Sequence, residues 1–219
     1  MWTMIGAIAL TASGLTAPVD KTKWARTYAE NETQTYEIKA TMEGGGAKLD
    51  LTAEVVFKVK TKTSKGANLA MSTSKFTILM DGSDAGASGP DELFSEFRGD
   101  GIPQLMSTEN YAWIYILAAS CGIVPTEEVE VGKSFNIDWK ADDKTSSVKG
   151  SGKLAEWVER EGKKAGRIEY QLEVNPNDPT PGVVKCSTFV DRESGAPIAC
   201  EGSVDVDSGS IKFSVKRLK

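Results

Sequence analysis

The sequence predicts a mainly β protein with a small α part. The expected architecture is a strongly curved antiparallel sheet of about nine strands, half-barrel or sandwich-like, packed on one or two helices from residues 90–120. Long runs alternate apolar and polar residues, and turn signals rich in Gly, Lys and Asp separate them. One nearly apolar stretch in the middle of the chain lacks this alternation. Because an apolar helix must avoid water, we expect it to lie against the apolar face of the sheet.

The strands are predicted from apolar residues that recur at every second position. Val55, Phe57 and Val59 alternate with charged residues, which is typical of a strand with one buried and one wet face. Turn signals at Gly44–Gly46 and Lys65–Gly66 bound this strand. The nine expected strands cover residues 33–42, 48–62, 67–81, 133–141, 146–160, 163–174, 182–191, 196–206 and 209–218.

The middle of the chain predicts a loop followed by helical structure. Residues 82–92 are rich in Gly, Ser and Asp, and Pro90-Asp91-Glu92 is typical of a helix start. The short helix that follows would carry Leu93, Phe94 and Phe97 on one side. The run at 111–120 reads as a buried helix, or as a buried strand because of its aromatic and β-branched residues.

The N-terminus predicts export. Residues 1–17 are uncharged, small and apolar, and too short to span a bilayer as a helix, as expected of a signal peptide or an apolar leader. The alternative is an apolar segment that stays in the fold. The remaining residues 18–219 are predicted to form a single β-rich domain in the periplasm or outside a bacterial cell. Its expected parts are a β meander at 18–82, a loop and helical insert at 83–125, and a second meander at 126–219.

The chain contains no histidine, which removes the commonest general base and the commonest metal ligand. Carboxylate pairs such as Asp142-Asp143 and Asp205 with Asp207 fall in turns or on polar strand faces. No catalytic, cofactor or metal signature is present, so we expect a non-catalytic protein without a cofactor. The net charge of −5 and the scattered lysines argue against a nucleic-acid partner.

Two of the three cysteines predict a cross-strand pair. Cys186 and Cys200 flank the turn Asp191–Gly195 at equal distances from Glu193, and both have the apolar parity of their strands. A symmetric hairpin would place them opposite each other on the core face, where a disulfide is one outcome and two buried thiols the other. Cys121 follows the apolar run and is expected to be a buried thiol.

Four short runs resemble uncharacterised exported bacterial β-rich proteins. They are Val131–Phe135, Gly150–Leu154, Gly162–Ala165 leading to Ile168-Glu169, and Asp191–Gly195. The corresponding patterns in those proteins are VGxSW, GxGKL, GKKxAxIE and DxxTG. Phe135 replaces the usual Trp, and Ser194 the usual Thr. The resemblance covers residues 126–206 and implies the fold and export, without an activity. The general plan is also similar to that of periplasmic lipoprotein carriers, which hold acyl chains in a half-barrel closed by helices; this likeness is one of architecture.

The predicted function is the binding of an apolar ligand or lipid between sheet and helix. The residues expected to contact it are Leu93, Phe94, Phe97, Trp113, Ile116 and Leu117. The alternative is a structural or protein-interaction domain of the cell envelope with a protein partner; a hydrolase without histidine is the least favoured alternative. We expect a monomer.

Overall fold

A computed structural model describes residues 21–44, 46–87, 93–98, 101, 123–125, 127–140, 147–174, 182–206 and 209–218. Within these residues the chain forms one antiparallel sheet. Its strands are β1 (Thr33–Gly44), β2 (Ala47–Lys62), β3 (Gly66–Met80), β4 (Ser83–Asp84), β5 (Leu93–Arg98), β6 (Ser134–Lys140), β7 (Ser147–Arg160), β8 (Lys163–Val174), β9 (Gly182–Asp191), β10 (Pro197–Val206) and β11 (Gly209–Arg217).

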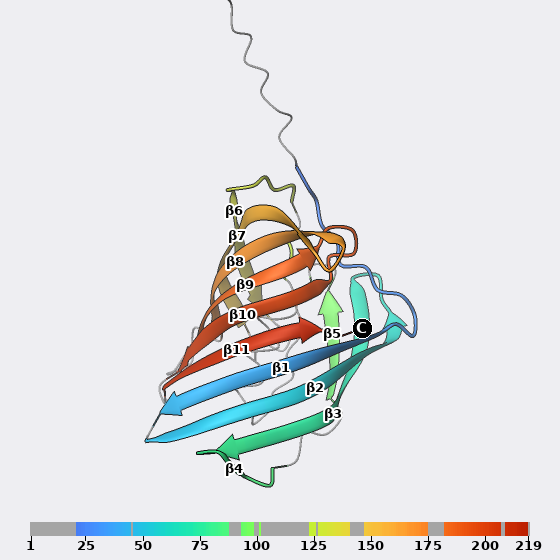
Figure 1. The fold of residues 1–219 in the computed structure, drawn as a ribbon. Coiled ribbons are helices and arrows are strands. Elements are labelled where there is room, and N and C mark those ends of the chain that lie inside the picture. Colours follow the sequence, from blue (N-terminus) through green and yellow to red (C-terminus); the bar gives the residue numbers. More distant parts are fainter. Residues whose placement is uncertain are drawn as a thin grey trace, which may run out of the picture.

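The sheet consists of two meanders joined by the first and last long strands. The strand order is β4-β3-β2-β1-β11-β10-β9-β8-β7-β6, and β5 also pairs with β3. Tyr36 of β1 lies opposite Arg217 of β11, and the pairing continues to Glu43 and Ser210. The sheet curls strongly but does not close into a barrel, because β6 and β4 lie at opposite ends of this order (Figure 1).

The nine predicted strands are confirmed, each with ends within two residues of those expected. The helix predicted at Leu93–Phe97 is wrong, because these residues form β5, paired with Gly66–Met71 of β3. That half of β3 has a second edge whose backbone groups need hydrogen-bond partners, and this outweighs the local helix-start signal. The apolar run at 111–120 lies outside the described residues. Every regular element in the described part of the chain is a strand, so the α part has no support there.

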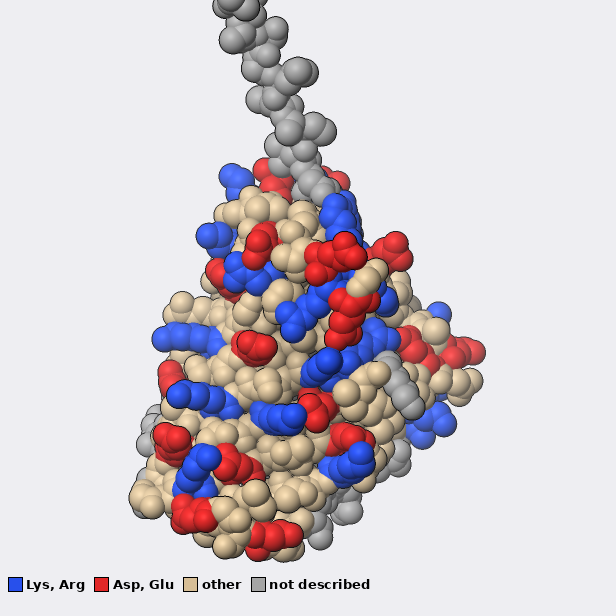
Figure 2. All heavy atoms as spheres, viewed as in Figure 1, with Lys and Arg blue, Asp and Glu red and all other residues tan. Residues whose placement is uncertain are grey.

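The two faces of the sheet differ in polarity as the alternation predicts. The inner face carries the hydrophobic core, in which Ile38, Ala53, Leu154, Ile168 and Val204 are fully buried. The outer face carries mostly charged and polar residues, with a few apolar ones such as Leu79 and Phe189. Figure 2 shows that basic and acidic side chains are interspersed over the face in view. A single amphipathic sheet therefore separates water on one side from an apolar interior on the other.

Glycine at two inner positions of β7 lets this strand bend closely around its neighbours. Gly150 has φ 148°, and a Cβ there would lie 2.1 Å from the carbonyl oxygen of Gln171. A Cβ on Gly152 would lie 2.3 Å from the ring of Phe135, which covers this glycine and meets Tyr170 edge-on at 6.3 Å. The glycines of the GxGKL run are therefore packing requirements in the middle of a strand.

The expected register of Cys186 and Cys200 is wrong by two residues. Cys186 pairs with Gly202, and Cys200 pairs with Thr188. The turn is one residue longer than the symmetric one, because Asp191 pairs with Ala196, and a register shift between Pro197 and Ala199 adds a second residue. A shift of two preserves the face, so both cysteines remain buried, as predicted, and both are free thiols. The Thr188 hydroxyl lies between them and donates to the Cys200 sulfur at 3.2 Å.

Candidate functional site

The inner face is not equally covered along its length. At the end formed by the C-terminal half of β1 and its partners in β2 and β3, the apolar side chains are only partly buried. Met42 pairs with Leu49, and Leu49 pairs with Met80, which is 50% exposed. The next row, Leu51 with Ile78, is half-buried. This end therefore presents a contiguous row of accessible apolar groups on the concave side of the sheet.

The opposite end of the inner face is closed by an extended segment, Lys21–Tyr28. Its residues alternate between exposed and buried, with Thr22, Trp24, Arg26 and Tyr28 on the buried side. Thr22 exchanges backbone hydrogen bonds with Val129, and the amide of Thr27 donates to the carbonyl of Ser194. The segment thus lies across the ends of strands that are far away in the sequence, with the Trp24 side chain in the core.

Trp24 fits a space that a glycine leaves open. A Cβ added to Gly166 would lie 2.8 Å from two ring atoms of Trp24. The indole also packs against Trp157, with ring centroids 5.3 Å apart. Two cations also lie near the Trp157 ring: the guanidinium of Arg192 is 4.6 Å and the ammonium of Lys164 is 5.4 Å from its centroid. The end of the half-barrel is therefore closed by an aromatic pair with two cations beside it.

Arg26 occupies a buried position of this segment, where an apolar residue would be expected. It is 9% exposed, and its Nη2 donates to Oε1 of Gln34 at 2.8 Å. The hydroxyl of Tyr36 donates to the same oxygen at 2.6 Å. The guanidinium also lies 5.2 Å from the ring centroid of Tyr28. Gln34 and Tyr36 have the parity of the inner face, so Arg26 is a cation on the core side of the sheet.

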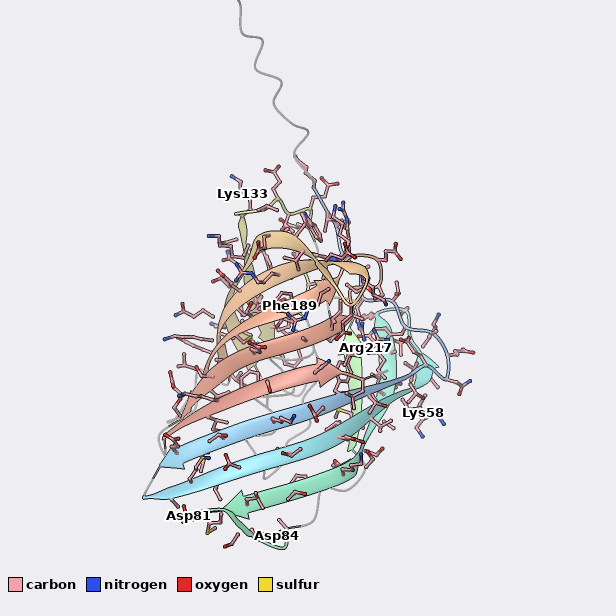
Figure 3. The ribbon with its side chains drawn as sticks, viewed as in Figure 1. Lys58, Asp81, Asp84, Lys133, Phe189 and Arg217 are labelled. Atoms are coloured by element: carbon pink, nitrogen blue, oxygen red, sulfur yellow. The ribbon has the colours of Figure 1, made fainter. Side chains whose placement is uncertain are left out.

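Gln34 links Arg26 to the carboxylate of Glu32. The Gln34 amide nitrogen donates to Glu32, whose other oxygen accepts from the amide of Ala29 at 2.9 Å. Burial alone would raise the pKa of Glu32, but these hydrogen bonds and the charges of Arg26 and Arg217 outweigh it and lower the pKa. Arg217 lies at the end of β11 (Figure 3). Glu32 is therefore ionised at neutral pH, with its oxygens used by other donors.

One donor of Arg26 is left over. Its Nη1 is buried and has no hydrogen-bond partner in the part of the chain that the structure describes. Three other buried atoms share this state, namely Nε1 of Trp24, Nε1 of Trp157 and Oγ of Ser187. Arg26 is the charged member of this group, and an unsatisfied buried charge costs far more free energy than a neutral donor.

The outer face has a shallow depression of about 530 Å³ over β1, β2, β10 and β11. It forms where short side chains such as Thr41 and Ser214 lie among long ones such as Lys39, Glu201 and Lys212. Two of its charged groups pair with neighbours: Asp50 pairs with Lys48 at 2.8 Å and accepts from Thr41 at 2.7 Å, and Lys39 pairs with Glu37 at 2.9 Å. The hydrogen bonds from Lys48 and Thr41 both lower the pKa of Asp50. A set of exposed and mutually paired groups is weaker evidence for a site than the buried Arg26. The outer-face residue Phe189 lies further along the sheet, on β9 (Figure 3).

The ligand contacts predicted from the sequence stay a prediction. Leu93, Phe94 and Phe97 belong to β5. Trp113, Ile116 and Leu117 lie outside the described residues, as does Cys121. Sequence reasoning missed Arg26. The available signal was the alternation of Thr22, Trp24, Arg26 and Tyr28 ahead of the first predicted strand.

The structure places this chain among proteins that are built on one open, strongly curved antiparallel sheet with an apolar concave face. Neither a family model nor a curated protein matches the sequence. Among solved structures, a DUF1329 family protein from Desulfovibrio piger is similar over 85% of this chain and 84% of its own, at 10% identity and a TM-score of 0.26. That similarity is too low to transfer a fold or a function.

The described residues contain no helix long and apolar enough to cross a membrane. They also contain no group of three or more Cys, Asp or Glu side chains placed to hold a metal ion.

Proposed function

We propose that this chain is a non-catalytic exported protein of the bacterial cell envelope, which binds an apolar ligand, a lipid, against the inner face of its sheet. The observation that carries the proposal is the partly exposed apolar row at the open end of that face, which consists of the half-buried Met42 and Leu49 and the exposed Met80. The apolar residues 1–17 support export.

The chemistry of the row favours a flexible apolar ligand. Each square ångström of apolar surface removed from water contributes about 25 cal/mol, so covering several such side chains supplies useful binding energy. Methionine adapts to ligands of irregular shape, since its side chain is unbranched and polarizable. The outer face is mostly polar, with single apolar residues such as Leu79 and Phe189 opposite charged ones.

The test compares two neighbouring positions of β2 that face opposite sides. Binding of the neutral fluorophore N-phenyl-1-naphthylamine, and its displacement by lipids, is measured for the wild type, Leu51→Gln and Thr52→Gln. We expect severalfold weaker binding for Leu51→Gln, which places an amide on the inner face, and no change for Thr52→Gln on the outer face. Equal effects of the two substitutions, or no binding by the folded wild type, would overturn the proposal.

Export is tested separately. Residues 1–20 fused to a phosphatase that is active only after export should give activity, and the same fusion with Ile8→Arg should not. Native mass spectrometry of the protein purified from the periplasm should then show a bound lipid.

A further inference from the structure

The unpaired Nη1 of Arg26 belongs to a side-chain network that also contains Gln34, Tyr36 and Glu32. Oε1 of Gln34 accepts from Arg26 and Tyr36, and its amide nitrogen donates to Glu32. Both oxygens of Glu32 accept hydrogen bonds. The network therefore holds the Arg26 guanidinium in one orientation through Nη2, and leaves Nη1 without an acceptor among the described residues.

A guanidinium in this state is suited to a ligand that brings its own acceptor. Guanidinium binds carboxylates through parallel N–H···O bonds, and such charge-assisted bonds are about twice as strong as neutral ones. The surroundings are apolar and aromatic: Tyr28 lies under the guanidinium, and Tyr36 packs edge-on against Phe57 with ring centroids 5.5 Å apart. A free inorganic anion would gain little from these rings, whereas an amphiphile would use both features.

We propose that Arg26 binds the carboxylate of a fatty acid whose apolar chain lies on the inner face of the sheet. The inference rests on the proposed function and deepens it, because it names an anionic head group as part of the ligand. Arg26 supplies Nη1 to a carboxylate oxygen. Gln34 and Tyr36 are positioning residues, which fix the guanidinium without contact to the ligand.

The experiment compares two ligands that differ only in the head group. Calorimetry and displacement of the fluorophore are used to measure the affinity of the full chain for palmitate and for methyl palmitate. The wild type should prefer palmitate about tenfold or more, since one charge-assisted bond is gained. This preference should disappear at a pH low enough to protonate the fatty acid.

Two substitutions separate the roles. Arg26→Met should lose the preference and keep the affinity for methyl palmitate. The control Arg160→Met removes a half-buried arginine elsewhere in the sheet, whose guanidinium lies 4.0 Å from the ring centroid of Phe189, and should keep the preference. Equal loss of both ligands in a folded Arg26→Met protein would show that Arg26 only supports the fold, which overturns the inference.

The wild-type comparison alone keeps the inference testable if Arg26→Met fails to fold. Equal affinity of the wild type for the two ligands overturns the role of Arg26 and leaves the proposed function standing. Failure of both ligands to bind overturns the proposed function as well, so the two failures are distinguishable.

Discussion

At the scale of single residues, the contact between Gly166 and Trp24 controls how the N-terminal segment closes the sheet. Gly166→Ala would place a methyl group 2.8 Å from the indole and 3.1 Å from Leu154. Trp24 is 3% exposed and tightly enclosed, so the ring has little room to move. We expect a loss of about 1–3 kcal/mol in the free energy of unfolding, measured by urea denaturation.

The double variant Trp24→Ala, Gly166→Ala tests whether the contact with the indole causes the loss of stability. Trp24→Ala alone should cost about 3–5 kcal/mol. Once the indole is absent, the added methyl group has space, so Gly166→Ala should cost much less in that background. An unchanged cost would place the strain elsewhere, for example against Leu154.

The alternation of apolar and polar residues predicts which face of the sheet a side chain occupies, but it does not predict which residues pair with one another. The inner parity of Cys186 and Cys200 follows from alternation, and it is confirmed. Their pairing depends on one extra turn residue and one register shift, and neither has a composition that marks it in the sequence. Whether Nη1 of Arg26 finds an acceptor depends on where Gln34 and Glu32 lie relative to Arg26, and only the folded chain sets these positions.

At the scale of elements, Asp191 organises the turn between β9 and β10. Its Oδ1 accepts from the amides of Glu193 at 2.8 Å and Ser194 at 3.3 Å, and its Oδ2 accepts from Lys163 at 2.9 Å. Asp191→Ala removes all three bonds and should cost about 1–3 kcal/mol. Asp191→Asn retains an acceptor for the two amides and should cost about 1 kcal/mol or less. Urea denaturation at pH 7 measures both costs.

The pH dependence of stability distinguishes the contribution of the Asp191 charge from that of its hydrogen bonds within the turn. Burial would raise the pKa of Asp191, but the bonds from Lys163 and the two amides outweigh it and lower the pKa. A carboxylate with a lowered folded-state pKa stabilises the protein above its unfolded pKa, and this contribution is lost as the pH falls through the folded value. Stability should therefore fall less steeply below pH 4 in Asp191→Asn than in the wild type. Parallel curves would contradict this assignment.

Among the elements, the long strands were predictable and β5 was not. An amphipathic strand of nine or more residues repeats its signal many times, so a local irregularity such as the register shift between Glu54 and Val55 does not hide it. The six residues of β5 carry a weak pattern, and the preceding Pro90-Asp91-Glu92 favours a helix start. A free edge of β3 decides the outcome, and such an edge is a property of the sheet, which the local sequence does not contain.

At the scale of the whole molecule, alternation predicts two meanders and an amphipathic curved sheet. It does not predict which of their edges meet, because several strands have similar faces. The structure joins them through β1 and β11. The partly exposed apolar row and the buried Arg26 then lie at opposite ends of the same inner face, which no local pattern could show.

The joining of the two meanders also bears on how this chain could be divided. In the described sheet, every strand pair except β1–β11 lies within one meander. A chain cut between residues 101 and 123 would therefore yield two polypeptides, each with all of its internal hairpins. The Lys21–Tyr28 segment would still reach across to the carbonyl of Ser194 and to Val129. The two pieces should behave as complementary fragments that reassemble without a covalent link, and a split luciferase fused to them would report that association.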